Sequence, residues 1–155
     1  MNKTEKRIAR CLCLEILYAH ASTGSNFTDI LDNFFTKKNN ILDYQLIDAQ
    51  IKYASKLYDA TLLHSKTVDS LIESKLVNWE MKRLALIDKI ILRMSISEML
   101  YIDDIPPKVS IAEGVEIAKE FSTKDSSGFV NGILDAVYNE NFNTIVNTIT
   151  TKDNK

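Results

Sequence analysis

Apolar side chains recur along most of the chain at the spacing of amphipathic helices. In the first such segment, residues 4–21, they lie three or four positions apart, which places them on one face of a helix. The residues that set this spacing are Ile8, Leu12, Ile16 and Ala19. A polar cluster at 22–26 ends the pattern, and apolar residues between Phe27 and Phe35 predict a shorter second helix that ends within the polar residues 37–40.

The middle of the chain predicts helices that are longer or more deeply buried. From Asp43 to Leu76 a near-helical period without Gly or Pro predicts one long helix, or two helices that separate near residues 65–67. Residues 84–102 are so densely apolar that they predict a central helix and not a surface one.

Two breaks divide the C-terminal part of the chain. Residues 103–107 end in two prolines and require a turn, because proline lacks a backbone donor and disfavours helix before it. The next helix is expected to begin straight after them or at Ser110, which has the spacing of a capping box. A second break at 122–127 precedes a last helix, for which Asp125 or Ser126 is the expected N-cap.

Composition agrees with a single all-helical domain. The chain has 155 residues, of which 45% are apolar and 26% charged, and only 4 Gly and 2 Pro are available for the tight turns of a β-fold. We expect residues 1–142 to form one helical domain of two packed halves that meet near Asn78. Residues 143–155 are rich in Asn and Thr, and we expect this polar tail to fray.

The cysteines and histidines do not predict a metal site. Cys11 and Cys13 lie on different sides of the predicted helix, so they cannot bond to each other, and with His20 and His64 they give too few ligands for zinc. His20 is expected to have a capping role at the end of its helix. Two reduced thiols, and no apolar run of the roughly 20 residues that span a bilayer, predict a soluble cytoplasmic protein without a membrane partner.

Charge is distributed unevenly along the chain. The first ten residues carry a net charge of +3 within a total of −2, so the remainder carries −5. The cations Lys3, Lys6, Arg7 and Arg10 follow the spacing i, i+3, i+4 and i+7, which projects them onto one face of a helix. Such a stripe can contact successive phosphates of one nucleic-acid strand. A solvated basic N-terminus is the alternative.

Catalytic motifs are absent from the sequence, and it predicts neither an enzyme nor a cofactor. The one tryptophan, Trp79, is expected to pack in the core or between helices. Phe129 follows the small residues 126–128 at the start of the last helix, where free backbone N–H groups and the ring could receive a phosphate or a base. Core packing is the alternative for Phe129.

Longer strings of residues are more specific. The chain resembles the NusB transcription antitermination factor family over residues 4–140. The strings that carry this resemblance are Arg7-Ile8-Ala9-Arg10, Leu17-Tyr18, Arg83-Leu84 after Trp79, Ile87-Asp88 before Ile91-Leu92-Arg93, Asp104-Ile105-Pro106-Pro107-Lys108-Val109, Glu116-x-Ala118-Lys119-x-Phe121 and Phe129-Val130-Asn131-Gly132-Ile133-Leu134-Asp135.

The resemblance implies an all-helical fold of two helical subdomains, without enzymatic activity. It implies binding to the single-stranded boxA element of ribosomal RNA leader transcripts together with NusE, a small-subunit ribosomal protein. The resulting complex joins an elongating RNA polymerase and makes it resistant to termination. Whether the free protein forms a homodimer stays open.

Carried over by position, the family's basic motif falls on Lys6, Arg7 and Arg10. The family's second RNA-facing region corresponds to Lys124, Asp125 and Phe129. The resemblance also implies contact with RNA or NusE at Tyr18 and Asp88.

Two departures from the family pattern have consequences. Glu5 precedes the basic motif, which implies weaker and more partner-dependent RNA affinity. Gly114 lies inside a predicted helix, where glycine costs about 1 kcal/mol relative to alanine and lowers the expected rigidity.

Two other functions fit the sequence. One is a protein adaptor that does not bind RNA. The other is an accessory domain acting in trans with an RNA cytosine methyltransferase, because NusB-like domains also occur fused to such enzymes.

Overall fold

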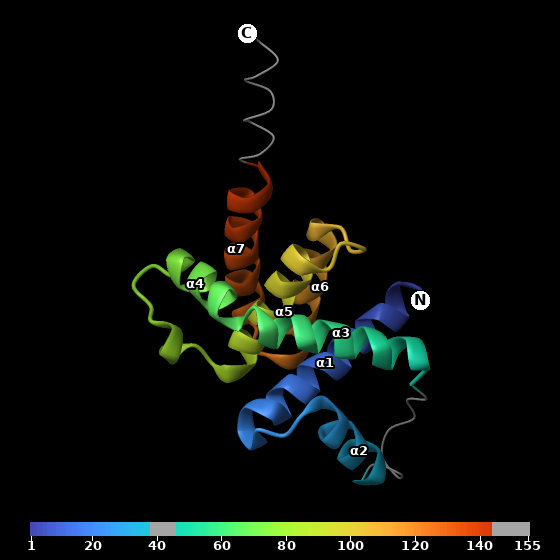
Figure 1. The fold of residues 1–155 in the computed structure, drawn as a ribbon. Coiled ribbons are helices and arrows are strands. Elements are labelled where there is room, and N and C mark those ends of the chain that lie inside the picture. Colours follow the sequence, from blue (N-terminus) through green and yellow to red (C-terminus); the bar gives the residue numbers. More distant parts are fainter. Residues whose placement is uncertain (38–45, 144–155) are drawn as a thin grey trace. The chain divides into compact units, whose positions relative to one another are not determined.

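A computed structural model describes residues 1–37 and 46–143 of the chain (Figure 1). Its α-helices are α1 (Lys3–Thr23), α2 (Phe27–Lys37), α3 (Asp48–Leu63), α4 (Ser65–Lys75), α5 (Leu86–Tyr101), α6 (Pro107–Phe121) and α7 (Ser126–Tyr138). A 3-10 turn, η1 (Met81–Arg83), precedes α5, and a π-helical turn, η2 (Asn139–Asn143), follows α7. The described residues contain no strand, so the predicted all-helical class is confirmed.

The chain divides into two compact units, Met1–Leu63 and His64–Lys155. The predicted division near Asn78 was therefore wrong. Of the two forms predicted for the segment that ends at Leu76, two helices are present, and they separate at His64. The start predicted at Asp43 and the fraying predicted for the tail beyond Asn143 lie outside the described residues.

In the first unit, α1 is closed at both ends by local hydrogen bonds. Asn2 and Glu5 form a capping box, in which the Glu5 N–H donates to Asn2 Oδ1 (2.9 Å) and the Asn2 N–H donates to Glu5 Oε2 (2.7 Å). Gly24 ends the helix with φ 71°, and its N–H donates to the His20 carbonyl. This left-handed conformation is one that glycine adopts without steric cost.

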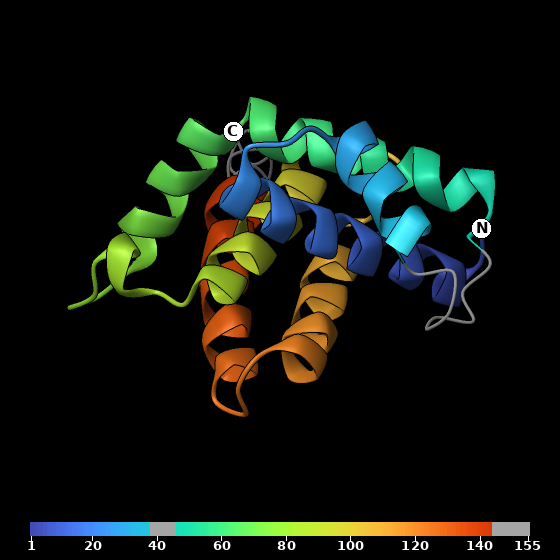
Figure 2. The ribbon, with the colours of Figure 1, turned by 90° about the horizontal axis from the view of Figure 1, so that it is seen from below.

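The core of the first unit forms where α1 packs against α2 and α3 (Figure 2). Cys13, Ile16 and Leu57 are fully buried there. His20 does not only close its own helix, because its Nδ1 lies 2.7 Å from the Ser25 carbonyl and 3.1 Å from the hydroxyl of Tyr58 on α3. This ring therefore joins the end of α1 to the following loop and to α3.

In the second unit, α5 packs against α4, α6 and α7, as its dense apolar sequence predicted. Ile91, Leu92 and Ile96 on this helix are fully buried. The Arg93 guanidinium on α5 donates two hydrogen bonds to the Asp69 carboxylate on α4, at 2.7 and 3.0 Å. This bidentate ion pair fixes α4 against the central helix.

Gly114 has a packing role within the second unit. A Cβ atom at this position would lie 2.5 Å from Ser95 Oγ on α5 and 3.0 Å from Leu134 Cδ1 on α7. A side chain larger than hydrogen would therefore push α6 away from both helices. The sequence predicted only the cost of this glycine and not its packing reason.

Helix α6 begins at Pro107, directly after the turn, and not at Ser110. Proline fits the first position of a helix because the N–H that it lacks has no intrahelical partner there. Among the described helices, none combines the length and apolar character needed to cross a bilayer.

Candidate nucleic-acid interface

The basic N-terminus of α1 is accessible only in part. Lys3 is exposed and Lys6 and Arg7 are half-buried, whereas Arg10 is 2% exposed. The Arg10 guanidinium lies over the ring of Tyr53 on α3, 5.8 Å from its centroid, in cation–π geometry. The expected stripe of four accessible cations is therefore wrong at Arg10, because α3 supplies an aromatic surface that covers this side chain.

Tyr18 lies on the same side of α1 as Arg7. Its side chain is 46% exposed. Tyr18 follows Arg7 by eleven positions, and at about 100° per residue this spacing brings the two side chains within about 20° of the same face, roughly 16 Å apart along the axis. Lys3, one turn before Arg7, lies near this face as well. Lys3, Arg7 and Tyr18 therefore lie near one face of α1, and the buried Leu14 (1% exposed) lies on this face between Arg7 and Tyr18.

The turn between α6 and α7 carries the second group of predicted residues. Lys124 and Asp125 are exposed. Asp125 occupies the N-cap position of α7, as predicted, but its φ of −81° and ψ of −18° are helical and its side chain makes no capping hydrogen bond. Its carboxylate therefore stays available at the surface.

Asp88 on α5 forms hydrogen bonds with both ends of this turn. Its Oδ1 accepts a hydrogen bond from Ser122 Oγ (2.6 Å) and its Oδ2 accepts one from Ser126 Oγ (3.0 Å). The side chain is buried. Both carboxylate oxygens are thus engaged within the second unit, which gives Asp88 a structural role beneath Lys124 and Asp125 and leaves the predicted direct contact with a partner as a prediction.

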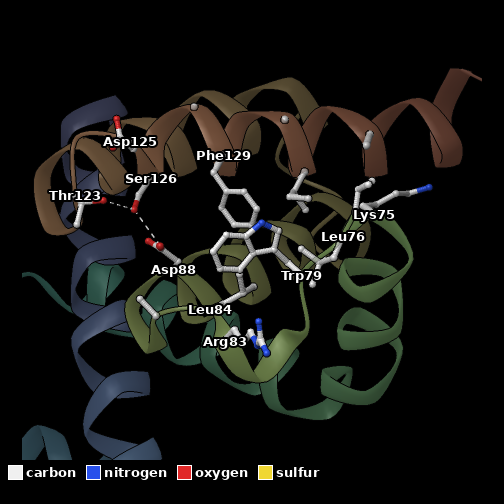
Figure 3. A pocket seen from close by; sticks show the side chains of 16 residues that line it. Lys75, Leu76, Trp79, Arg83, Leu84, Asp88, Thr123, Asp125, Ser126 and Phe129 are labelled. Atoms are coloured by element: carbon white, nitrogen blue, oxygen red, sulfur yellow. Dashed lines mark hydrogen bonds between the residues drawn. The ribbon is translucent and has the colours of Figure 1, made fainter.

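A cavity of about 560 Å³ opens in the second unit between the α4–α5 loop and α7 (Figure 3). Phe129 on α7 and Trp79 in the loop both line it. Phe129 is half-buried, but Trp79 is 59% exposed. The prediction that Trp79 packs in the core or between helices was therefore wrong.

The exposed indole is a residue that sequence reasoning missed. Asn78, directly before it, has φ 61°, a left-handed conformation that asparagine adopts more readily than most residues. The exposed indole lacks the favourable free energy of burial, which is about 25 cal/mol per Å² of apolar surface. One signal of this exposure is available in the sequence. The helical spacing of apolar residues breaks at Val77-Asn78, between residues 76 and 85.

The remaining titratable clusters do not predict a further site. Within residues 1–37 and 46–143, no group of three or more His, Cys, Asp or Glu side chains could hold a metal ion. Burial raises the pKa of the Tyr58 hydroxyl above its ordinary value of 10.0, and the nearby Asp59 and Cys13 raise it further. Tyr58 belongs to the core of the first unit and not to either candidate surface.

Relatives of known name cover almost the whole chain. A sequence model of the NusB family matches residues 7–139. The transcription antitermination protein NusB of Chloroherpeton thalassium is 40% identical over 135 residues, which make up 87% of this chain and 62% of that protein. The chain thus spans less than two thirds of that relative. NusB of Geotalea daltonii is 37% identical over 138 residues, covering 86% of this chain and 94% of that protein.

Solved structures agree with the fold. T. maritima NusB superposes with a TM-score of 0.74 at 31% sequence identity, covering 87% of this chain and 91% of the other. A crystal structure of the antitermination factors NusB and NusE in complex with dsRNA superposes with a TM-score of 0.73 at 25% identity, covering 90% and 99%. With a family model that matches 7–139 and relatives at this level of identity, the chain belongs to the NusB family.

Proposed function

We propose that this protein is a transcription antitermination factor that binds boxA-type RNA of ribosomal RNA leader transcripts together with NusE. The complex then renders RNA polymerase resistant to termination in the cytoplasm. Family membership supports this proposal, as do relatives named transcription antitermination protein and a similar structure that contains NusB, NusE and dsRNA. The role is binding and not catalysis.

The observation that carries the proposal is the set of accessible side chains on α1. Lys3, Lys6 and Arg7 offer cations to phosphates, and the exposed ring of Tyr18 offers a surface on which an unpaired base can stack. The Asn2–Glu5 capping box gives this end of α1 a defined geometry, and Gln50 Nε2 on α3 donates to the Glu5 carbonyl (3.3 Å). The cations are thus presented from a fixed helix end.

Arg10 has a different role in this proposal from the one that its spacing predicts. Its buried guanidinium over Tyr53 joins α1 to α3 and so positions the turn that bears Lys6 and Arg7. Lys124, Asp125 and Phe129 form the second RNA-facing region on the other unit. Tyr18 and Asp88 are proposed to contribute to the surface that RNA or NusE contacts, Asp88 by holding the α6–α7 turn.

Fluorescence anisotropy of a labelled boxA-type RNA tests the proposal. The protein is titrated alone and with NusE, at two salt concentrations and against a scrambled RNA of the same length. We expect tighter and sequence-selective binding with NusE present, and an affinity that falls as salt rises because phosphates release their counterions. Equal affinity for both RNAs with NusE present contradicts the proposed specificity.

A matched pair of variants identifies the surface. Arg7→Ala is expected to weaken binding and to reduce the salt slope by about one phosphate contact. Lys56→Ala, a cation on α3 in the same unit, serves as the control and is expected to leave the slope unchanged. If no RNA is bound with or without NusE, the protein is an adaptor and the antitermination role requires another RNA-binding component.

A further inference from the structure

The α4–α5 loop leaves two apolar side chains in water. Val77 is 76% exposed and Trp79 is 59% exposed. Exposed apolar groups that gather at one place on a soluble protein indicate an interaction site. The left-handed turn at Asn78 lies between these two residues.

The loop is anchored at its stem. Lys75, the last residue of α4, forms an ion pair with Glu140 of η2, and Leu84 caps η1 before α5 begins. The ion pair joins the start of the loop to η2, and the hydrogen bond from the Leu84 N–H to the Met81 carbonyl closes η1 within the loop.

Small residues form part of the cavity wall that α7 provides. Gly128, Gly132 and Ala136 lie four residues apart on α7 and all line the cavity. A Cβ atom added at Gly128 or Gly132 would meet nothing within 4 Å, so open space lies in front of the helix backbone. The volume of about 560 Å³ falls within the usual range of small-ligand pockets, about 300–1,000 Å³.

Aromatic and polar groups surround this space. Figure 3 shows the Phe129 ring directed from α7 toward the indole of Trp79, across the same cavity. Arg83 lies at its rim, and its exposed guanidinium makes no hydrogen bond or ion pair within the described residues. Asp125 also lines the cavity, and Figure 3 shows its carboxylate directed away from the two rings.

A flat aromatic ligand joined to a phosphate fits this arrangement. Two aromatic side chains suit the faces of a base, and a guanidinium suits a phosphate. An apolar protein side chain would use the walls but leave the Arg83 guanidinium without a function. The cavity also adjoins Lys124, Asp125 and Phe129, the second region of the proposed RNA surface.

We propose that this groove holds one unstacked base of the bound RNA, with Trp79 as a stacking residue and Arg83 on the adjoining phosphate. The inference rests on the proposed function, because it requires that RNA is bound. It adds Trp79 as an RNA-binding residue and a second place of RNA contact, which the side chains of α1 do not supply.

The single tryptophan makes the inference directly measurable. The full chain is prepared with 5-fluorotryptophan, so that its one ¹⁹F resonance reports on residue 79 even when NusE contains tryptophan. BoxA-type RNA is added with NusE present, and the same titration is repeated with oligonucleotides in which one base at a time is replaced by an abasic site. We expect the RNA to shift the resonance, and one abasic position to abolish the shift while phosphates remain in place.

Variants give an independent measure by anisotropy. Trp79→Ala is expected to weaken RNA binding about 10-fold, within the range of base–aromatic stacking, and Trp79→Phe to restore most of the affinity. Val109→Ala removes another exposed apolar side chain from the same unit, outside the cavity, and is expected to leave affinity unchanged.

The outcomes separate the inference from the proposed function. If RNA binds by anisotropy but neither the resonance nor the Trp79→Ala affinity changes, the groove is not an RNA site and the proposed function stands. If NusE alone shifts the resonance and RNA adds nothing, the groove docks protein and the inference is wrong. If RNA does not bind at all, the proposed function fails and the inference fails with it.

Discussion

The Asp88 carboxylate near the start of α5 accepts a 3.0 Å hydrogen bond from the hydroxyl of Ser126, the first residue of α7. Its second oxygen accepts from Ser122 at the end of α6. One side chain on the central helix therefore holds both ends of the turn that carries Lys124 and Asp125. This relationship links the stability of the second unit to the geometry of a candidate RNA surface.

Asp88→Ala is expected to lower the free energy of unfolding by about 2 kcal/mol, because it removes the acceptor of two serine hydroxyls at a buried position. Urea denaturation measures this change. Asp103→Ala removes an exposed carboxylate and is the control, with an expected change within about 0.5 kcal/mol. Equal stability of the two variants contradicts the anchoring role of Asp88.

Two glycines are expected to respond to alanine with opposite signs. Gly114→Ala places a methyl group 2.5 Å from Ser95 Oγ, and such overpacking costs about 1–3 kcal/mol. Gly132→Ala, in the interior of α7 with nothing within 4 Å, is expected to stabilise the protein by about 0.5–1 kcal/mol through helix propensity. Thermal unfolding of both variants measures the difference, and a stabilised Gly114→Ala variant would show that α6 can shift without cost.

The two glycines also show how far the sequence could be interpreted. Helix propensity predicts the same cost at both positions, and only the close approach of α5 and α6 distinguishes them. Helix ends such as Pro107 and Asp125 were predicted because their signals are local. The burial of Arg10 depends on Tyr53, and the serine bonds of Asp88 bridge more than 30 residues, so neither is contained in a local pattern. Trp79 was misassigned because apolar character alone predicts burial.

Variants of Arg10 and Lys6 are expected to distinguish a residue that positions α1 from a residue that contacts a phosphate. Arg10→Ala removes a buried cation from the Tyr53 ring and is expected to lower the free energy of unfolding by about 2 kcal/mol or more. Lys6→Ala alters a half-buried cation with no ion pair among the described residues, so we expect stability to change by less than about 0.5 kcal/mol and the salt slope of RNA binding to fall. Unfolding and anisotropy are measured on the same preparations. If the Arg10→Ala variant keeps the stability of the native chain but loses one phosphate contact, Arg10 binds RNA directly.

Tyr58 is expected to make the first unit sensitive to alkaline pH. Burial raises the pKa of this hydroxyl above its value of 10.0 in an unfolded chain, with further contributions from Asp59 and Cys13. The folded state therefore holds the proton more tightly, so the stabilisation is fully present below about pH 10 and is lost as pH rises through the folded-state pKa. Urea midpoints of the native chain are expected to fall more steeply above about pH 10 than those of Tyr58→Phe, which lacks the titrating group. Tyr18→Phe, at an exposed position of α1, is the matched control and should retain the steep decline. If Tyr58→Phe declines as steeply as the native chain, the alkaline sensitivity arises elsewhere in the protein.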